Sequence, residues 1–179
     1  MLFTGHSYGG AVITVAGVAE NVVGLVFVNA YALDEGESLG ALQSGFPDSA
    51  LAANLVYTPY PVEGASEPGT DVSVGVAAFP DVFAAGVPEK AAKVLAVSQR
   101  PLASVAFGEP ASAAAWKTKP GWGIVSKNDH TINPDVQRFG YKRAGLRKVV
   151  EIESSHLVML THPSEVAQLI TDAVAELGR

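Results

Sequence analysis

A serine flanked by glycines near the start of the chain is the feature that most restricts its fold. Residues Gly5-His6-Ser7-Tyr8-Gly9 have the pattern G-x-S-x-G, in which the glycines let a strand turn sharply into a helix. Met1–Thr4 is expected to be the strand before this turn. Gly10–Ala19 is small and apolar on all sides, which is typical of a helix packed against a buried sheet. The pattern therefore predicts an α/β fold with Ser7 exposed at the tip of the turn.

Two further segments place an acid and an imidazole directly after strands. Gly123–Ser126 is predicted to be a strand, and Asp129 follows it by about one turn; Val149–Ile152 is another, and His156 lies in the loop beyond it. Open parallel sheets carry their functional side chains at strand ends. An acyl-transfer serine needs an imidazole to take its proton and a carboxylate to set the imidazole tautomer. These residues therefore point to nucleophilic chemistry.

With these motifs the chain resembles the α/β-hydrolase superfamily, and within it the small esterase-like members that carry a helical cap. The order serine, acid, histidine is that of the family. The resemblance implies that Ser7 is the nucleophile, His156 the general base and Asp129 the triad acid. It also implies that the Tyr8 backbone N–H is one oxyanion donor. The expected activity is hydrolysis of a small-molecule carboxylic ester, with neither cofactor nor metal.

The resemblance also predicts the organisation of the chain as a single, partial α/β-hydrolase domain. It matches roughly the C-terminal two thirds of a full member, with a mostly parallel sheet flanked by helices. We expect the core in residues 1–30 and 116–179, and a helical cap insertion over about 31–115. The almost continuous apolar run Val22–Ala30 indicates a parallel strand buried on both faces.

Prolines and other turn residues divide the expected cap into short pieces. A helix is predicted over Pro88–Gln99, and Glu63–Thr70 is a connection rich in glycine, proline and serine. After the cap and the second part of the core, an amphipathic last helix is expected from about Pro163 to Leu177, with Glu165 near its positive end.

Family members have several βα units before the glycine-flanked serine, and this chain has none. The strand before Ser7 is therefore expected at an exposed sheet edge, which is a site for strand addition. The loop that donates the second oxyanion N–H is also absent. We expect residues 1–179 alone to associate or fold poorly, with activity at least about 10²-fold below that of a full-length enzyme. An inactive fragment is one alternative.

Each site residue has a competitor. Asp34 follows the preceding strand at a similar distance, and Asp135 also lies near Asp129. A hydroxynitrile-lyase type of reaction, in which the triad acts only as a base, is a second enzymatic alternative, weakly suggested by Lys127 beside the acid.

Arg100 is either a charge that faces the substrate or a solvated helix end. The remaining histidines are interpreted as hydrogen-bonded neighbours of the site (His6 and His130) and as a solvated helix cap (His162). The four histidines are too dispersed to predict a metal site. Several aromatic residues of the insertion either line a substrate pocket or form the cap core: Tyr31, Phe46, Tyr57, Tyr60, Phe79, Phe83 and Phe107.

Composition narrows the remaining possibilities. The net charge of −6 without a basic patch argues against nucleic acid or an anionic membrane as a partner. The absence of cysteine excludes disulfides and thiol catalysis, and is compatible with a cytoplasmic protein. No apolar run reaches the roughly 20 residues of a membrane span, and the N-terminus lacks the features of a signal peptide.

Overall fold

A four-stranded parallel sheet forms the centre of the computed structural model, which describes residues 1–178. The strand order is β1-β2-β6-β7, and every neighbouring pair is parallel. The strands are β1 (Leu2–Ser7), β2 (Gly24–Ala30), β6 (Gly121–Ser126) and β7 (Lys148–Ile152). The predicted parallel α/β fold is confirmed, and β1 lies at the sheet edge where it was expected.

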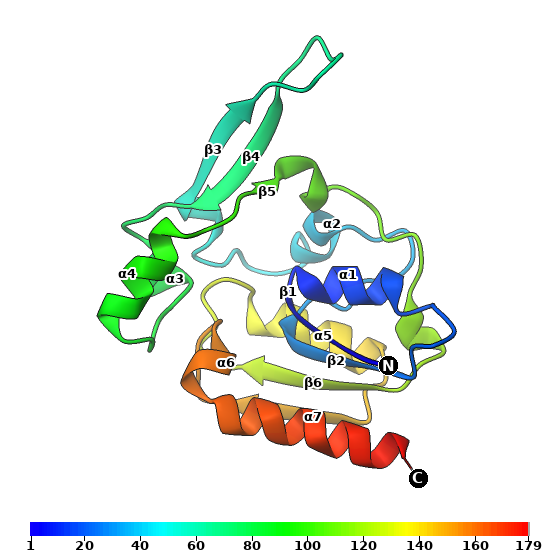
Figure 1. Ribbon diagram of the computed structural model, residues 1–179. Coiled ribbons are helices and arrows are strands. Elements are labelled where there is room, and N and C mark those ends of the chain that lie inside the picture. The colour runs from blue at the N-terminus through cyan, green and yellow to red at the C-terminus, as the bar shows by residue number, and fades with distance from the viewer. Residues whose placement is uncertain (179) are drawn as a thin grey trace.

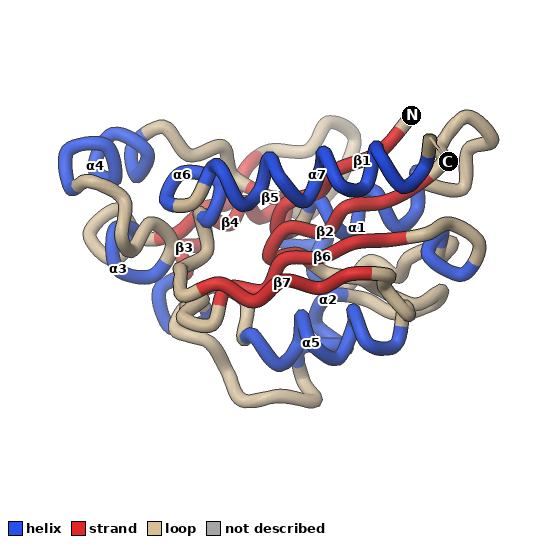
Figure 2. Tube along the Cα trace, turned by 90° about the horizontal axis from the view of Figure 1, so that it is seen from below, coloured by secondary structure: helices blue, strands red, loops and turns tan. Residues whose placement is uncertain are grey.

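Helices cover both faces of this sheet (Figures 1 and 2). The helices of the core are α1 (Gly9–Ala16), α5 (Pro134–Arg143), α6 (Val158–Thr161) and α7 (Pro163–Leu177). Leu25 and Phe27 of β2 pack with α1 and α5, whereas Val26 and Val28 pack with α7. This alternation is the period of two of a strand, and it explains why the apolar run is unbroken: both of its faces are covered.

The last helix follows its predicted bounds. Val166, Leu169 and Ala173 are buried on one face of α7, which lies against the sheet. These positions are three to four residues apart, as expected for an amphipathic helix. Among the described residues, no helix is both long and apolar enough to cross a membrane.

The segment between β2 and β6 is helical only in part. The predicted helix over residues 88–99 is α4 (Glu89–Val97). The connection predicted over Glu63–Thr70 spans residues 61–68 instead, at the end of a hairpin that projects from the body (Figure 1), because Gly69 and Thr70 already belong to a strand. A three-stranded antiparallel sheet in the order β3-β4-β5 was not predicted. Pro59 lies inside β3, which is tolerated because β3 is an edge strand. The elements are α2 (Leu39–Gln43), β3 (Leu55–Tyr60), β4 (Gly69–Val74), α3 (Phe79–Val82), α4 (Glu89–Val97) and β5 (Leu102–Ala103), with short 3₁₀ turns at Ala52–Asn54, Ser104–Phe107 and Ala115–Lys117.

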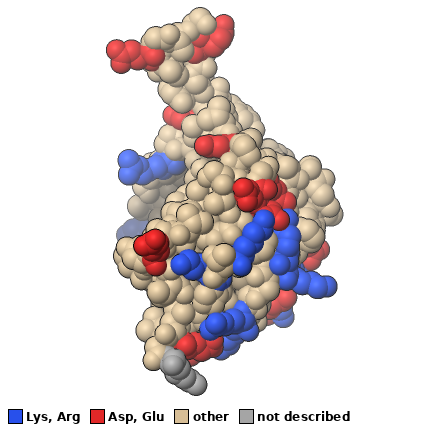
Figure 3. Space-filling view, turned by 90° about the vertical axis from the view of Figure 1, so that its right-hand side faces the viewer, with Lys and Arg blue, Asp and Glu red and all other residues tan. Residues whose placement is uncertain are grey.

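Surface charges of both signs lie side by side on the face in Figure 3. Among the described residues, Arg138 pairs with Glu151 at 2.7 Å and Lys148 pairs with Asp172 at 2.8 Å. Such exposed pairs contribute little stability individually, typically below about 1 kcal/mol.

Candidate active site

Ser7 lies at the sharp turn between β1 and α1, as its glycine-flanked pattern predicts. Its φ of +56° is in the left-handed region, which is uncommon for a residue with a side chain and is often found at functional turns. A Cβ added at Gly5 would lie 2.4 Å from the Gly9 carbonyl oxygen, so only glycine fits there. Position 9 differs from the expectation, because a Cβ there would meet nothing within 4 Å. The second close approach is made by Gly10, where a Cβ would lie 2.3 Å from the Tyr31 carbonyl oxygen.

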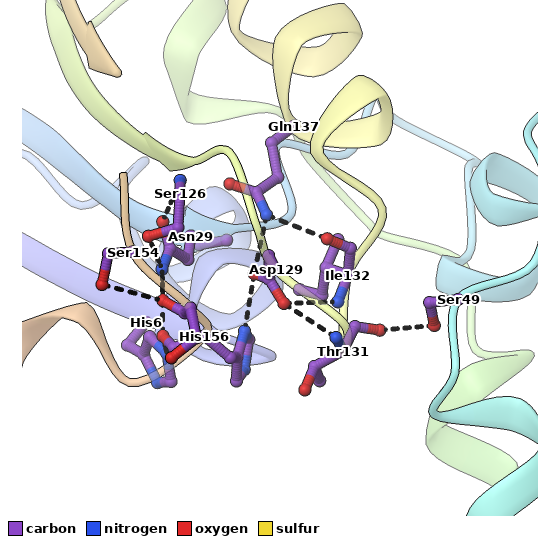
Figure 4. A network of polar contacts seen from close by, with 12 residues as sticks. His6, Asn29, Ser49, Ser126, Asp129, Thr131, Ile132, Gln137, Ser154 and His156 are labelled. Atoms are coloured by element: carbon purple, nitrogen blue, oxygen red, sulfur yellow. Dashed lines mark hydrogen bonds and ion pairs between the residues drawn. The ribbon is translucent and has the colours of Figure 1, made fainter. Parts of the chain in front are cut away.

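Asp129 and His156 form a fully buried pair at the carboxyl end of the sheet (Figure 4). The His156 Nδ1 and Asp129 Oδ2 atoms are 2.8 Å apart, and neither side chain is exposed. Asp129 Oδ1 also accepts hydrogen bonds from the backbone N–H groups of Thr131 and Ile132, and Oδ2 accepts one from Gln137 Nε2. Because these three donors orient the carboxylate as an acceptor, we assign the proton of the shared hydrogen bond to His156 Nδ1.

The opposite ring nitrogen of His156 is left as an acceptor. His156 Nε2 is buried and has no hydrogen-bond partner among the described residues. Its ring lies beside that of His6, the residue before Ser7, with 4.5 Å between the ring centroids. No hydrogen bond joins Ser7 Oγ to Nε2 within residues 1–178. A buried imidazole nitrogen without a partner can accept a proton from a hydroxyl group brought next to it.

A cavity of about 490 Å³ opens above Ser7. Its lining combines residues of the turn, including Ser7 and Tyr8, with residues of the insertion between β2 and β6. Four of the seven aromatic residues singled out from the sequence contribute to it: Tyr31, Phe79, Phe83 and Phe107. Phe83 also packs edge-on against the His156 ring, at 4.7 Å between centroids. The insertion therefore forms much of the lining of this open cavity and makes the lining largely apolar.

One backbone donor lies at the base of this cavity. The Tyr8 N–H makes no hydrogen bond within the described residues, and Tyr8 is the N-cap residue of α1. The first N–H groups of a helix lack partners inside the helix and carry partial positive charge. Such a group can stabilise an oxyanion that forms on a substrate bound to Ser7.

The competing acids lie elsewhere. Asp34 forms an ion pair with Lys117, and Asp135 forms one with Arg138; neither contacts a histidine. Lys127, which suggested a cation near the site, is exposed and pairs with Glu153 at 2.8 Å. It does not line the cavity, so this reason for a lyase is lost.

The other histidines have structural contacts. His6 Nε2 lies 3.0 Å from the His156 carbonyl oxygen, which confirms its interpretation as a hydrogen-bonded neighbour. His130 is exposed, and its Nδ1 lies 3.2 Å from the carbonyl oxygen of Asp81 in α3. His162 is the N-cap residue of α7, but its side chain is half-buried and makes no capping hydrogen bond. His162 thus lies at the predicted helix start, but its side chain does not cap the helix: its Nδ1 lies 3.0 Å from Thr161 Oγ1 instead.

Burial and, to a smaller extent, the neighbouring His156 together lower the pKa of His6 from 6.5 to about 3, against the opposing effects of the His156 carbonyl and Asp129. The unfolded chain therefore takes up a proton at His6 near pH 6.5, whereas the folded chain does so only near pH 3. The stability linked to His6 is complete above pH 6.5 and is lost as the pH falls toward 3.

We predict that His6→Gln makes the protein less sensitive to acid. Urea unfolding midpoints of wild type and variant, measured between pH 7.5 and 4, should converge as the pH falls. The His6 contribution amounts to at most about 1.4 kcal/mol per pH unit. Parallel curves for the two proteins would show that His6 takes up protons equally in both states.

Comparisons with known proteins support the fold. A family model described as the alpha/beta hydrolase family matches residues 2–169. Polyneuridine aldehyde esterase superposes with a TM-score of 0.79 at 21% identity, over 97% of this chain and 71% of its own. A methylesterase from Arabidopsis gives 0.75 at 18% identity, over 98% and 69%. A pyrethroid hydrolase from Sphingobium faniae JZ-2 gives 0.70 at 21% identity, over 96% and 69%. No curated protein sequence is significantly similar.

Proposed function

Because the chain belongs to the alpha/beta hydrolase family, we propose that its site hydrolyses small carboxylic esters through Ser7, His156 and Asp129. The observation that carries this proposal is the buried His156–Asp129 pair, whose free Nε2 atom lies near the Ser7 turn. Similarity to solved structures named as esterases supports the reaction class.

The proposed reaction proceeds through an acyl-enzyme. Ser7 Oγ attacks the ester carbonyl carbon while His156 Nε2 takes the hydroxyl proton. Asp129 stabilises the resulting imidazolium through Nδ1–H, and the Tyr8 N–H donates to the oxyanion. The C–O bond to the alcohol then breaks, and His156 returns the proton to the leaving oxygen. Water, activated by the same imidazole, attacks the acyl carbon and releases the acid and free Ser7.

The composition of the cavity points to substrates with a bulky apolar group. Its volume of about 490 Å³ lies within the range of small-molecule sites. Its lining includes aliphatic and aromatic side chains, among them Val72, Phe79, Leu95 and Leu157. We therefore propose that the enzyme prefers aryl or branched apolar esters over small polar ones.

A covalent trap tests the reaction class. A fluorophosphonate probe should label wild-type protein at Ser7, identified by mass spectrometry of the modified peptide, and a p-nitrophenyl butyrate pre-incubation should compete with labelling. Labelling together with release of p-nitrophenol supports an acyl-enzyme. Binding of esters with neither Ser7 labelling nor turnover would exclude acyl transfer.

Arg100 offers a test of substrate choice within this proposal. It is exposed and lines the cavity, and it has no carboxylate within 4.0 Å among residues 1–178. It is also the only charged group of the lining at neutral pH, because His6 is neutral. We predict that Arg100→Gln raises KM for a p-nitrophenyl hemisuccinate about 2- to 5-fold, as for an exposed ion pair, and leaves p-nitrophenyl butyrate unchanged. If Arg100→Gln changed KM for the two esters equally, the guanidinium would not recognise the substrate charge, and Arg100 would be only a solvated residue after the end of α4.

A further inference from the structure

The main chain of His156 is held by two side chains outside the triad. The His156 carbonyl oxygen accepts a hydrogen bond from Asn29 Nδ2 at 2.9 Å and one from His6 Nε2 at 3.0 Å (Figure 4). Asn29 Nδ2 also contacts the Ser155 carbonyl oxygen, at 3.2 Å. Because the acceptor is a carbonyl, the His6 proton is on Nε2. Asp129 thus fixes the ring of His156, while His6 and Asn29 fix its backbone.

Asn29 is itself fixed at the end of β2. It is fully buried, and its φ of +43° is a left-handed value that asparagine tolerates better than most residues. Its Oδ1 accepts a hydrogen bond from the Ser126 N–H at 2.9 Å, and its Nδ2 donates to Ser126 Oγ at 2.8 Å. Ser126 ends β6, the strand that leads to Asp129. Asn29 therefore couples the segment that carries the acid to the loop that carries the imidazole.

His6 makes the corresponding link to the nucleophile. It directly precedes Ser7 on β1, and its ring lies against that of His156. The low pKa of about 3 keeps His6 neutral, so that it adds no positive charge beside the imidazolium that forms during the reaction. The segment that carries Ser7 is thereby connected to the His156 backbone directly through His6, and the segment that carries Asp129 is connected to it through Ser126 and Asn29.

We infer that Asn29 and His6 are positioning residues, which hold the His156 backbone so that Nε2 stays in reach of Ser7. This inference rests on the proposed function. Neither side chain takes part in the proposed bond making or breaking. Their loss should therefore lower kcat and leave KM nearly unchanged, because a misplacement of about 1 Å at a reacting group costs up to about 10² in rate.

Three variants test these side-chain contacts, and the one at Asn29 is chosen to avoid backbone strain. Asn29→Gly keeps the left-handed backbone accessible and removes every side-chain hydrogen bond, so we expect kcat to fall about 10- to 100-fold. His6→Ala should lower kcat about 10-fold, and His6→Gln, which retains an N–H donor of similar reach, should restore most of it. Because both residues hold one carbonyl group, the effects of Asn29→Gly and His6→Ala should not be additive.

The readouts separate positioning from general stability. The matched control is Thr14→Val, which removes a buried hydroxyl that bonds only within α1, to Gly10 O; it should reduce stability without changing kcat. Proton NMR should show the His156 Nδ1–H resonance downfield in wild type and shifted or exchange-broadened in Asn29→Gly and His6→Ala. An unchanged resonance together with unchanged kcat, or a loss of activity that merely follows stability as in Thr14→Val, would overturn the inference.

The two proposals fail in distinguishable ways. If wild type hydrolyses no ester, the proposed function fails, while the resonance still reports whether Asn29 and His6 hold His156. If Asn29→Gly does not fold, the His6→Ala and His6→Gln pair still decides, since a kcat equal to wild type in His6→Ala would contradict the inference.

Discussion

Replacing Ser7 by alanine is expected to lower kcat for p-nitrophenyl butyrate by about 10⁴-fold or more, because no other group can form the acyl intermediate. Alanine also has a Cβ, so the left-handed turn bears the same backbone strain and the fold should persist. An assay of p-nitrophenol release would measure the loss of kcat, and circular dichroism on the same preparation would show whether the fold persists.

Ser112→Ala is the matched control for this experiment. Ser112 is exposed and does not line the cavity above Ser7, so its replacement should leave kcat unchanged. A Ser7→Ala protein that retains wild-type turnover would refute the assignment of the nucleophile.

Asp129→Asn should cost on the order of 10⁴ in kcat and leave the fold intact. The asparagine oxygen can still accept from the Thr131 and Ile132 N–H groups, while its NH₂ group then faces His156 Nδ1. Nδ1 must become an acceptor, so the proton moves to Nε2, and the base can no longer accept the proton of Ser7. If the Gln137 amide turns, its Oε1 atom can accept a hydrogen bond from the new NH₂ group, at the cost of the bond from Nε2 to the Ile132 carbonyl oxygen.

Asp34→Asn provides the comparison for Asp129. Asp34 is paired with Lys117 and has no contact to the cavity, so we expect kcat to change less than 2-fold, as for a surface ion pair. The ratio of the two kcat values, measured on one ester at one pH, decides between the acids. A large effect at Asp34 with a small one at Asp129 would move the acid to the segment after β2.

The parts of the structure that could be predicted are those in which local pattern and burial agree. The apolar run of β2, the amphipathic spacing of α7 and the strand-turn-helix around Ser7 all carry strong local signals. The hairpin of β3 and β4 does not. Most of β3 is exposed, so its residues lack the alternation of a half-buried strand, and Pro59 argues against one.

The support around the site was missed for a related reason. Asn29 lies in an apolar strand, and its role depends on contacts to residues about 100 positions away, at Ser126 and His156. A polar residue at the end of a buried run was the only available signal. The sequence signal for Gln137 was similar, since Gln137 is a polar residue on the face of α5 that also buries Val136 and Tyr141. Both side chains are buried, and the amide N–H groups of each donate hydrogen bonds to neighbouring residues.

The steric demands of the turn also define how proteins with this turn can be recognised by sequence. The written pattern requires glycine at the positions of Gly5 and Gly9, whereas packing within this chain requires it at Gly5 and Gly10. A search that insists on glycine at position 9 therefore imposes a requirement that packing within residues 1–178 does not explain. A pattern built on positions 5, 7 and 10 would describe the turn by its geometry. It would also collect chains in which position 9 has diverged.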